Sequence, residues 1–124
     1  QILQHREALV FPVLWHEPLG LAVLESMYFG LPVFGTPYGS LPELVDRERG
    51  YLSKSKSQLA HAIREHNHYD RKKCHEFVAD NFSDRKMTEE YLKLFDIVLR
   101  GHTLNDHPPR TQRANQQPPF SIYE

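Results

Sequence analysis

The sequence predicts an α/β fold in which helices flank a short parallel sheet. The apolar run 8–15 is typical of a strand buried on both faces. Apolar side chains then recur at helical spacings over 21–28, and a second short strand is expected at 32–35. A further helix begins within 39–43. The order strand, helix, strand, helix is that of a parallel βαβα unit.

The boundaries of these elements follow from glycine and proline. Pro18 suits the first turn of the first helix, where no backbone N–H is needed. Gly30 stands where a left-handed residue ends a helix. Residues 1–7 resemble the end of an earlier helix, and 50–52 are expected to form an edge strand.

Three more helices are predicted towards the C-terminus. Their N-caps are expected at Ser55, which forms a capping box with Gln58, and at Asp70 and Ser83. Gly101 ends the last helix. The apolar stripes expected to pack inward are Leu59, Ala62, Ile63 and His66; then Cys74, Phe77, Val78 and Phe82; then Met87, Tyr91, Leu94, Phe95 and Val98.

Composition limits the function classes. A chain of 124 residues forms one domain, and its net charge of −1 gives no reason to expect a nucleic-acid partner. The single cysteine, Cys74, excludes an internal disulfide and fits a reducing compartment, so we expect a cytoplasmic protein. No apolar run is long enough for an integral membrane segment.

Two carboxylates indicate the kind of ligand. Glu17 and Glu25 are separated by seven residues. On one helix, this spacing rotates the side chains by about 80° and separates them by about 12 Å. The backbone amides at 19–22, at the start of that helix, suit a phosphate. Carboxylates bind sugar hydroxyls, so the pattern favours a nucleotide-diphosphate sugar.

The segment HEPLGLAVLESMYFGLPVFGTPYGSLPELV resembles the E-x7-E segment and following loop of retaining glycosyltransferases of the GT-B architecture. The resemblance covers 1–100 and implies the C-terminal part of a Rossmann-like, nucleotide-sugar-binding domain. It implies that Glu17 is catalytic and holds hydroxyls of the donor sugar, while Glu25 holds the ribose. Donor-binding residues are expected at His16, Glu17, Leu19, Gly20, Leu21, Ala22 and Glu25.

The same resemblance implies that part of the protein lies outside this sequence. No Lys or Arg occurs from residue 7 to 46, although a leaving diphosphate needs positive charge. In the resembled family that charge comes from earlier residues of the same domain, and an N-terminal domain binds the acceptor. We therefore expect this chain alone to be inactive. The donor sugar and the acceptor are not specified, and no cofactor is expected.

Several alternatives stay open at this stage. Glu17 is alternatively a helix cap and Glu25 a solvated side chain. The His and Cys residues over 61–75 lack ligand spacing, so no metal site is expected. Residues 101–124 read as a Pro/Gln-rich tail, either disordered or lying along another surface. A non-catalytic module that binds a nucleotide or a protein is the rival function.

Overall fold

The computed structural model describes residues 3–107 and 121–123. In this part of the chain, three parallel strands are hydrogen-bonded in chain order. They are β1 (Leu9–Phe11), β2 (Val33–Gly35) and β3 (Gly50–Leu52). The helices are α1 (Leu21–Tyr28), α2 (Leu41–Leu44), α3 (Lys56–Arg64), α4 (Arg71–Asn81) and α5 (Asp84–Leu99), with 3-10 turns η1 (Leu3–His5) and η2 (His66–His68).

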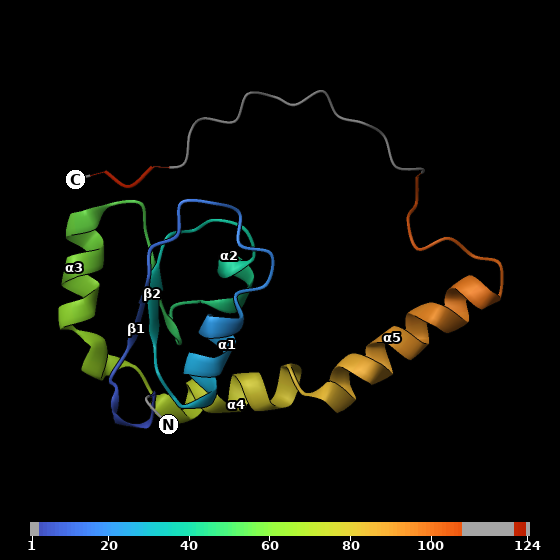
Figure 1. Cartoon of the computed structure of the whole chain (residues 1–124), viewed down its shortest axis with the longest axis horizontal. Coiled ribbons are helices and arrows are strands. Elements are labelled where there is room, and N and C mark those ends of the chain that lie inside the picture. The colour runs from blue at the N-terminus through green and yellow to red at the C-terminus, as the bar shows by residue number, and fades with distance from the viewer. Residues whose placement is uncertain (1–2, 108–120, 124) are drawn as a thin grey trace.

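The sheet lies between two layers of helices (Figure 1). Helix α3 packs against β2 and β3, whereas α1 packs on the other face against β1 and β2 and is in turn covered by α4. Both crossovers, through α1 and through α2, join parallel neighbours. The predicted class, a partial Rossmann-like α/β domain with a short parallel sheet flanked by helices, is confirmed.

The hydrophobic core fills the space between the sheet and α1. The central strand of the sheet, β2, is buried along its whole length: Val33 belongs to this core, and the fully buried Phe34 packs on the other face against Tyr69. Burial of this apolar surface is the main contribution to folding. The buried cluster comprises Val23, Leu24, Met27, Val33, Leu41, Leu44, Val45, Cys74 and Val78.

The first strand is shorter and less buried than predicted. The run 8–15 contains only β1, and Val10 is 51% exposed. Leu9 and Phe11 pack against the core, so Val10 points to the opposite face by the alternation of a strand. Helix α3 packs on β2 and β3 and leaves this side of β1 less covered. The expectation of burial on both faces was therefore wrong for β1.

The first helix starts later than predicted. It begins at Leu21, not around Pro18, because Gly20 takes a left-handed conformation with φ 77° and ψ 55°. The chain between β1 and Gly20 is therefore a loop, and it carries Glu17. At the other end, Gly30 has φ 76° directly after the helix, as predicted.

The three predicted N-caps are confirmed. The Asp70 carboxylate accepts from the Lys72 amide at 2.9 Å, and Ser83 Oγ accepts from the Lys86 amide at 3.1 Å. Ser55 Oγ accepts from the Gln58 amide, but the reciprocal half of the capping box does not form. The side-chain Oε1 of Gln58 instead accepts from Ser53 Oγ at 2.7 Å.

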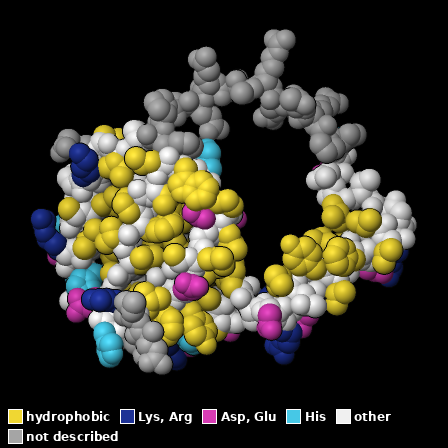
Figure 2. Space-filling model, viewed as in Figure 1, with side chains coloured by type: hydrophobic (Ala, Val, Ile, Leu, Met, Phe, Trp, Pro, Cys, Tyr) yellow, Lys and Arg dark blue, Asp and Glu magenta, His cyan; other side chains and the backbone are white. Residues whose placement is uncertain are grey.

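Helix α5 departs most from the prediction. Its apolar stripe was expected to pack inward, but none of its residues is buried against the described part of the chain. Tyr91 is 54% exposed and Phe95 is 56% exposed. The helix extends away from the domain, and its apolar side chains gather along one of its sides (Figures 1 and 2).

The chain ends are described only in part. Residues 3–5 form one 3-10 turn where the end of a helix was expected. Of the predicted tail 101–124, residues 108–120 and 124 lie outside the described residues. Ser121–Tyr123 lies along residues 54–56, which fits the alternative of a tail on another surface.

Candidate functional site at the carboxyl ends of β1 and β2

Two loops meet where β1 and β2 end. Because the strands are parallel, the loop after β1 and the loop after β2 leave the same edge of the sheet. The Thr36 hydroxyl, at the end of β2, donates to the Val13 carbonyl after β1. Ligands of open parallel sheets bind at this edge. The fold thus brings the predicted Glu17 region to the expected end of the sheet.

The second loop packs directly on the backbone of Glu17. The Ser40 amide donates to the Glu17 carbonyl oxygen at 2.8 Å. Gly39 has φ 64°, and a Cβ built there would lie 2.2 Å from that oxygen. Only glycine combines this backbone conformation with this close approach. The sequence predicts only that a helix begins within 39–43, and the structure adds that Gly39 packs against the backbone of the Glu17 turn.

The Glu17 side chain is oriented by its own loop. Its Oε1 accepts from the Gly20 amide at 3.0 Å, three residues along the chain. The residue is partly buried. This contact agrees with the alternative in which Glu17 acts as a helix cap. The N-cap position itself is occupied by Gly20 and not by Glu17. A carboxylate has two oxygens and several lone pairs, so this hydrogen bond leaves Oε2 for a second partner.

The backbone conformation of Gly20 accounts for its being glycine. The sequence leaves two interpretations open: backbone freedom at the helix start, and a missing side chain that lets a phosphate approach. A Cβ at Gly20 would point towards Leu41, Leu44 and Val23, each at 3.5 Å. Glycine is required at this position because the backbone has a positive φ. The Gly20 amide itself donates to Glu17 Oε1.

The first turn of α1 supplies the remaining predicted groups. The amides of Leu21 and Ala22 precede the first intrahelical bonds, which run from Val23 and Leu24 to the Gly20 carbonyl. Both residues are exposed. Glu25 is exposed and is the fifth residue of α1, so it lies about one turn into the helix instead of two. The predicted helical geometry between Glu17 and Glu25 was wrong, because Glu17 lies outside α1.

A groove of about 590 Å³ adjoins the Glu17 turn. It joins three of the predicted residues, His16, Glu17 and Leu19, to the second loop. Gly20, Leu21, Ala22 and Glu25 are not among its lining residues. Ser40 Oγ is buried there without a hydrogen-bond partner among the described residues. The lining residues are His16, Glu17, Pro18, Leu19, Gly39, Ser40, Glu43, Leu44 and Phe82.

Ser40 and Phe82 were not predicted as site residues. Phe82 follows α4 and was expected to pack inward, but it is 38% exposed at the groove. No signal in the local sequence could place it there, since it is distant from Glu17 along the chain. Ser40 lies in the segment 39–43 where a helix was predicted to begin, and a serine at a helix start was the available signal.

The groove is acidic. Glu17 and Glu43 contribute carboxylates, and none of the described residues that line it is Lys or Arg. Positive electrostatic character near the groove comes from two helix N-termini, that of α1 close by and that of α2, whose N-cap Ser40 lines the groove. A helix terminus carries only about half an elementary charge, which is small beside the charge of a diphosphate.

The histidines that cluster in sequence do not converge. His61 and His68 line a separate groove of about 530 Å³ with Tyr51 and Tyr69. The pKa of Tyr69 is raised by burial and by the nearby Tyr51. Cys74 is buried in the core. Among residues 3–107 and 121–123, no group of three or more His, Cys, Asp or Glu side chains is arranged to hold a metal ion.

The short parallel sheet flanked by helices defines the class of protein: a partial Rossmann-like α/β domain. Residues 1–84 match the family model of glycosyl transferases group 1. The chain belongs to this family, which assigns it to sugar transfer and implies binding of a nucleotide-sugar donor and an acceptor. No curated protein matches the chain significantly. No helix in the described residues has the length and apolar character needed to cross a membrane.

Proposed function

We propose that the Glu17 turn and the first turn of α1 form the donor site of a retaining GT-B glycosyltransferase. The observation that carries the proposal is the hydrogen bond from the Gly20 amide to Glu17 Oε1. It fixes a carboxylate directly beside the first-turn amides of a helix. A sugar nucleotide presents hydroxyls next to a diphosphate, and this arrangement offers an acceptor next to donors.

Each group has a distinct role in this proposal. Glu17 Oε2 accepts from sugar hydroxyls and stabilises positive charge that develops on the sugar. The amides of Leu21 and Ala22 donate to the diphosphate. The Gly20 amide does not, since it orients Glu17. Glu25, further along α1, accepts from the ribose hydroxyls. The family resemblance, with its E-x7-E spacing, supports the assignment of retention of configuration.

The proposed site is incomplete for catalysis. Departure of a diphosphate needs a cation or a comparable set of donors, and the described groove lining holds two carboxylates and no Lys or Arg. We infer that cations from outside these 124 residues, together with an acceptor-binding domain, complete it. The chain alone is therefore expected to bind a donor weakly, at roughly millimolar Kd, without transferring sugar.

Backbone amide NMR tests the binding site directly. A nucleoside diphosphate is titrated into the 124-residue chain at low salt, with the nucleoside as the control ligand. Shifts centred on Leu21 and Ala22 that weaken as salt rises are expected, because the interaction is electrostatic and exposed. Shifts confined to the basic stretch at Arg71–Lys73, or equal shifts with the uncharged nucleoside, would remove the diphosphate assignment.

A non-catalytic nucleotide-binding module is the second candidate, favoured by the absence of a cation in the described groove lining. Both candidate functions predict that this chain binds a nucleotide. They differ in whether the whole protein transfers sugar. Transfer of sugar by the longer protein, abolished by Glu17→Gln, supports the enzyme. Normal donor binding without turnover across a panel of donors and acceptors supports the module.

A further inference from the structure

A short segment near the C-terminus lies on the same edge of the sheet as the candidate site. Ser121–Tyr123 runs parallel to residues 54–56, which lead from the end of β3 into the first residue of α3. The Tyr123 amide donates to the Lys54 carbonyl at 2.7 Å, and the Lys56 amide donates to the Tyr123 carbonyl at 2.7 Å. This pair of hydrogen bonds on alternate residues is the pattern of one strand added to another.

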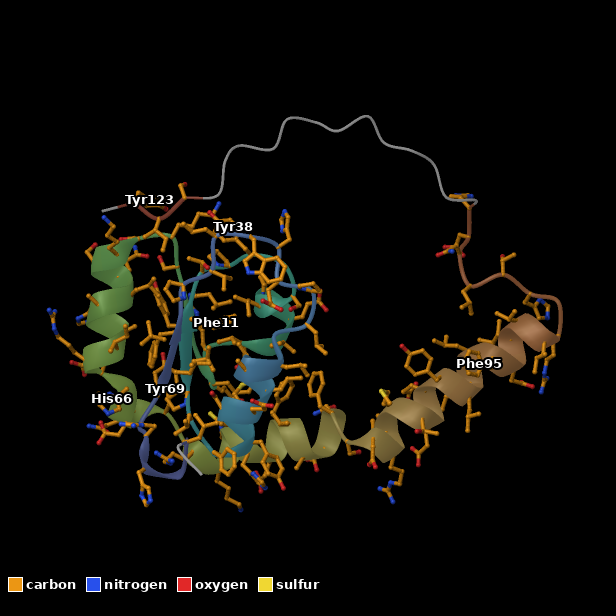
Figure 3. All side chains as sticks on the ribbon, viewed as in Figure 1. Phe11, Tyr38, His66, Tyr69, Phe95 and Tyr123 are labelled. Carbon is orange, nitrogen blue, oxygen red and sulfur yellow. The ribbon has the colours of Figure 1, made fainter. Side chains whose placement is uncertain are left out.

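The second anchor of this segment is Tyr38. Its side chain belongs to the loop after β2 and is only 7% exposed. The Tyr38 hydroxyl donates to the Ser121 carbonyl and accepts from the Ser121 amide, both at 2.8 Å. The Lys54 ammonium lies 5.0 Å from the centre of the Tyr38 ring. Figure 3 shows Tyr38 and Tyr123 at the same edge of the domain.

These contacts define a receptor surface made of Tyr38 and the backbone of residues 54–56. Its occupant here is the chain's own segment Ser121–Tyr123. The residues before it, 105–119, are dominated by polar residues and Pro, while Phe-Ser-Ile-Tyr at 120–123 has the β-branched and aromatic residues that favour strands. Ile122 is partly buried in the docked segment. The docked segment Ser121–Tyr123 thus belongs to the part of the tail with strand propensity.

The surface is connected to the Glu17 turn through one residue. Tyr38 contacts Ser121, and the next residue, Gly39, packs against the Glu17 backbone. Lys56 is the first residue of α3, so the Tyr123 carbonyl also serves one amide of that helix terminus. Binding of the segment therefore holds the loop after β2 and the start of α3 together.

We propose that Tyr38 and residues 54–56 form a binding surface for an extended peptide, that the chain's own Ser121–Tyr123 is its ligand, and that docking restrains the loop that supports Glu17. The recognition combines two backbone hydrogen bonds with a tyrosine hydroxyl that binds both the amide and the carbonyl of one ligand residue, Ser121. Such strand addition depends on backbone geometry and on one partly buried apolar side chain.

Hydrogen exchange of the Lys56 amide tests the docking. In a chain that ends at residue 120, this amide should exchange at least about fivefold faster, the factor that corresponds to one hydrogen bond. Tyr38→Phe in the full chain keeps the ring and should accelerate exchange of the Lys56 and Tyr123 amides in the same direction. Tyr91→Phe, on exposed α5, is the matched control and should change neither. Unchanged Lys56 exchange in the shortened chain would overturn the proposal.

The peptide PPFSIYE, residues 118–124, tests recognition between separate molecules. Added to the shortened chain, it should restore slow exchange at Lys56 with a Kd of roughly millimolar, and Tyr38→Phe should weaken that binding about fivefold. The same peptide with Ile122→Asp should not bind. Binding of both peptides alike, or of neither, would contradict a specific surface.

The connection between the docked segment and the Glu17 turn can be measured without any nucleotide. Removing residues 121–124 should shift the amide resonances of Gly39 and Ser40, and adding the peptide should restore them. Because no donor is present, this outcome is independent of the proposed sugar-nucleotide site. Shifts confined to residues 53–58 would overturn the inferred connection while leaving the docking intact.

Discussion

The amide of Ser40 donates to the carbonyl oxygen of Glu17 across 2.8 Å, joining the loop after β2 to the loop after β1. The contact requires Gly39 beside it, because no side chain fits between the two backbones. The position of the carboxylate that we assign to the donor sugar is thus set by a loop that does not itself need to contact the donor.

The close approach at Gly39 predicts a difference between two glycine substitutions. Gly20→Ala and Gly39→Ala both place a side chain at positive φ, at φ 77° and φ 64°, which costs about 1–2 kcal/mol. Only Gly39→Ala also produces a clash, so it should lower the free energy of unfolding by a further 1–3 kcal/mol or so. Urea unfolding of the two variants measures this difference. Equal losses would show that the Glu17 turn moves aside freely.

The assigned roles of the two carboxylates predict different ligand dependence. Glu25→Gln should weaken binding of a nucleoside diphosphate and of its sugar conjugate by a similar factor, roughly tenfold, because both ligands contain the ribose. Glu17→Gln should weaken binding of the sugar conjugate alone. Glu76→Gln, at an exposed position of α4, is the control. NMR titrations give all the affinities. Weaker binding of both ligands to Glu17→Gln would contradict the assignment of Glu17 to the sugar.

The uncovered face of α5 predicts a contrast between two phenylalanines. Phe34 is fully buried in β2, whereas Phe95 is 56% exposed on α5. Phe34→Ala should lower the free energy of unfolding by about 3–5 kcal/mol. Phe95→Ala in this chain should change it by less than about 0.5 kcal/mol. Chemical denaturation checks both values. A large loss from Phe95→Ala would show that α5 packs against the domain in solution.

The burial of Cys74 predicts that its thiol reacts slowly with alkylating reagents. Burial raises the pKa of the Cys74 thiol from 9.0 to about 11. At pH 8 the thiolate fraction is then about a hundredfold smaller than in an unfolded chain, and alkylation by iodoacetamide should be slowed at least by that factor. The rate should rise to that of a peptide thiol in denaturant. Fast labelling of the native chain would contradict the buried position.

The same pKa predicts how stability depends on pH. The raised native value favours the neutral thiol, so the contribution of Cys74 is fully present below pH 9, the unfolded value. It falls as the pH rises towards 11. Unfolding measured from pH 8 to 11 in the wild type and in Cys74→Ala should show this loss only in the wild type. A constant difference between the two chains would refute it.

Features with local causes could be predicted from the sequence. The order of strands and helices follows from apolar spacing and from glycine and proline, and Asp70 and Ser83 cap their helices because each hydrogen bond closes within three residues. Glu17, Gly20 and Glu25 could also be selected, since they occupy one short segment with a family pattern. These features depend on neighbours along the chain, which the sequence shows directly.

Only the tertiary structure decided how these parts meet. The left-handed Gly20 moved the start of α1 to Leu21 and left Glu17 outside the helix. The packing of the second loop on Glu17, the uncovered stripe of α5 and the docking of Ser121 on Tyr38 all depend on how distant segments are placed. The contact between Tyr38 and Ser121 spans 83 positions along the chain. No spacing rule reaches that far, because such contacts form only after the sheet has brought its loops to one edge.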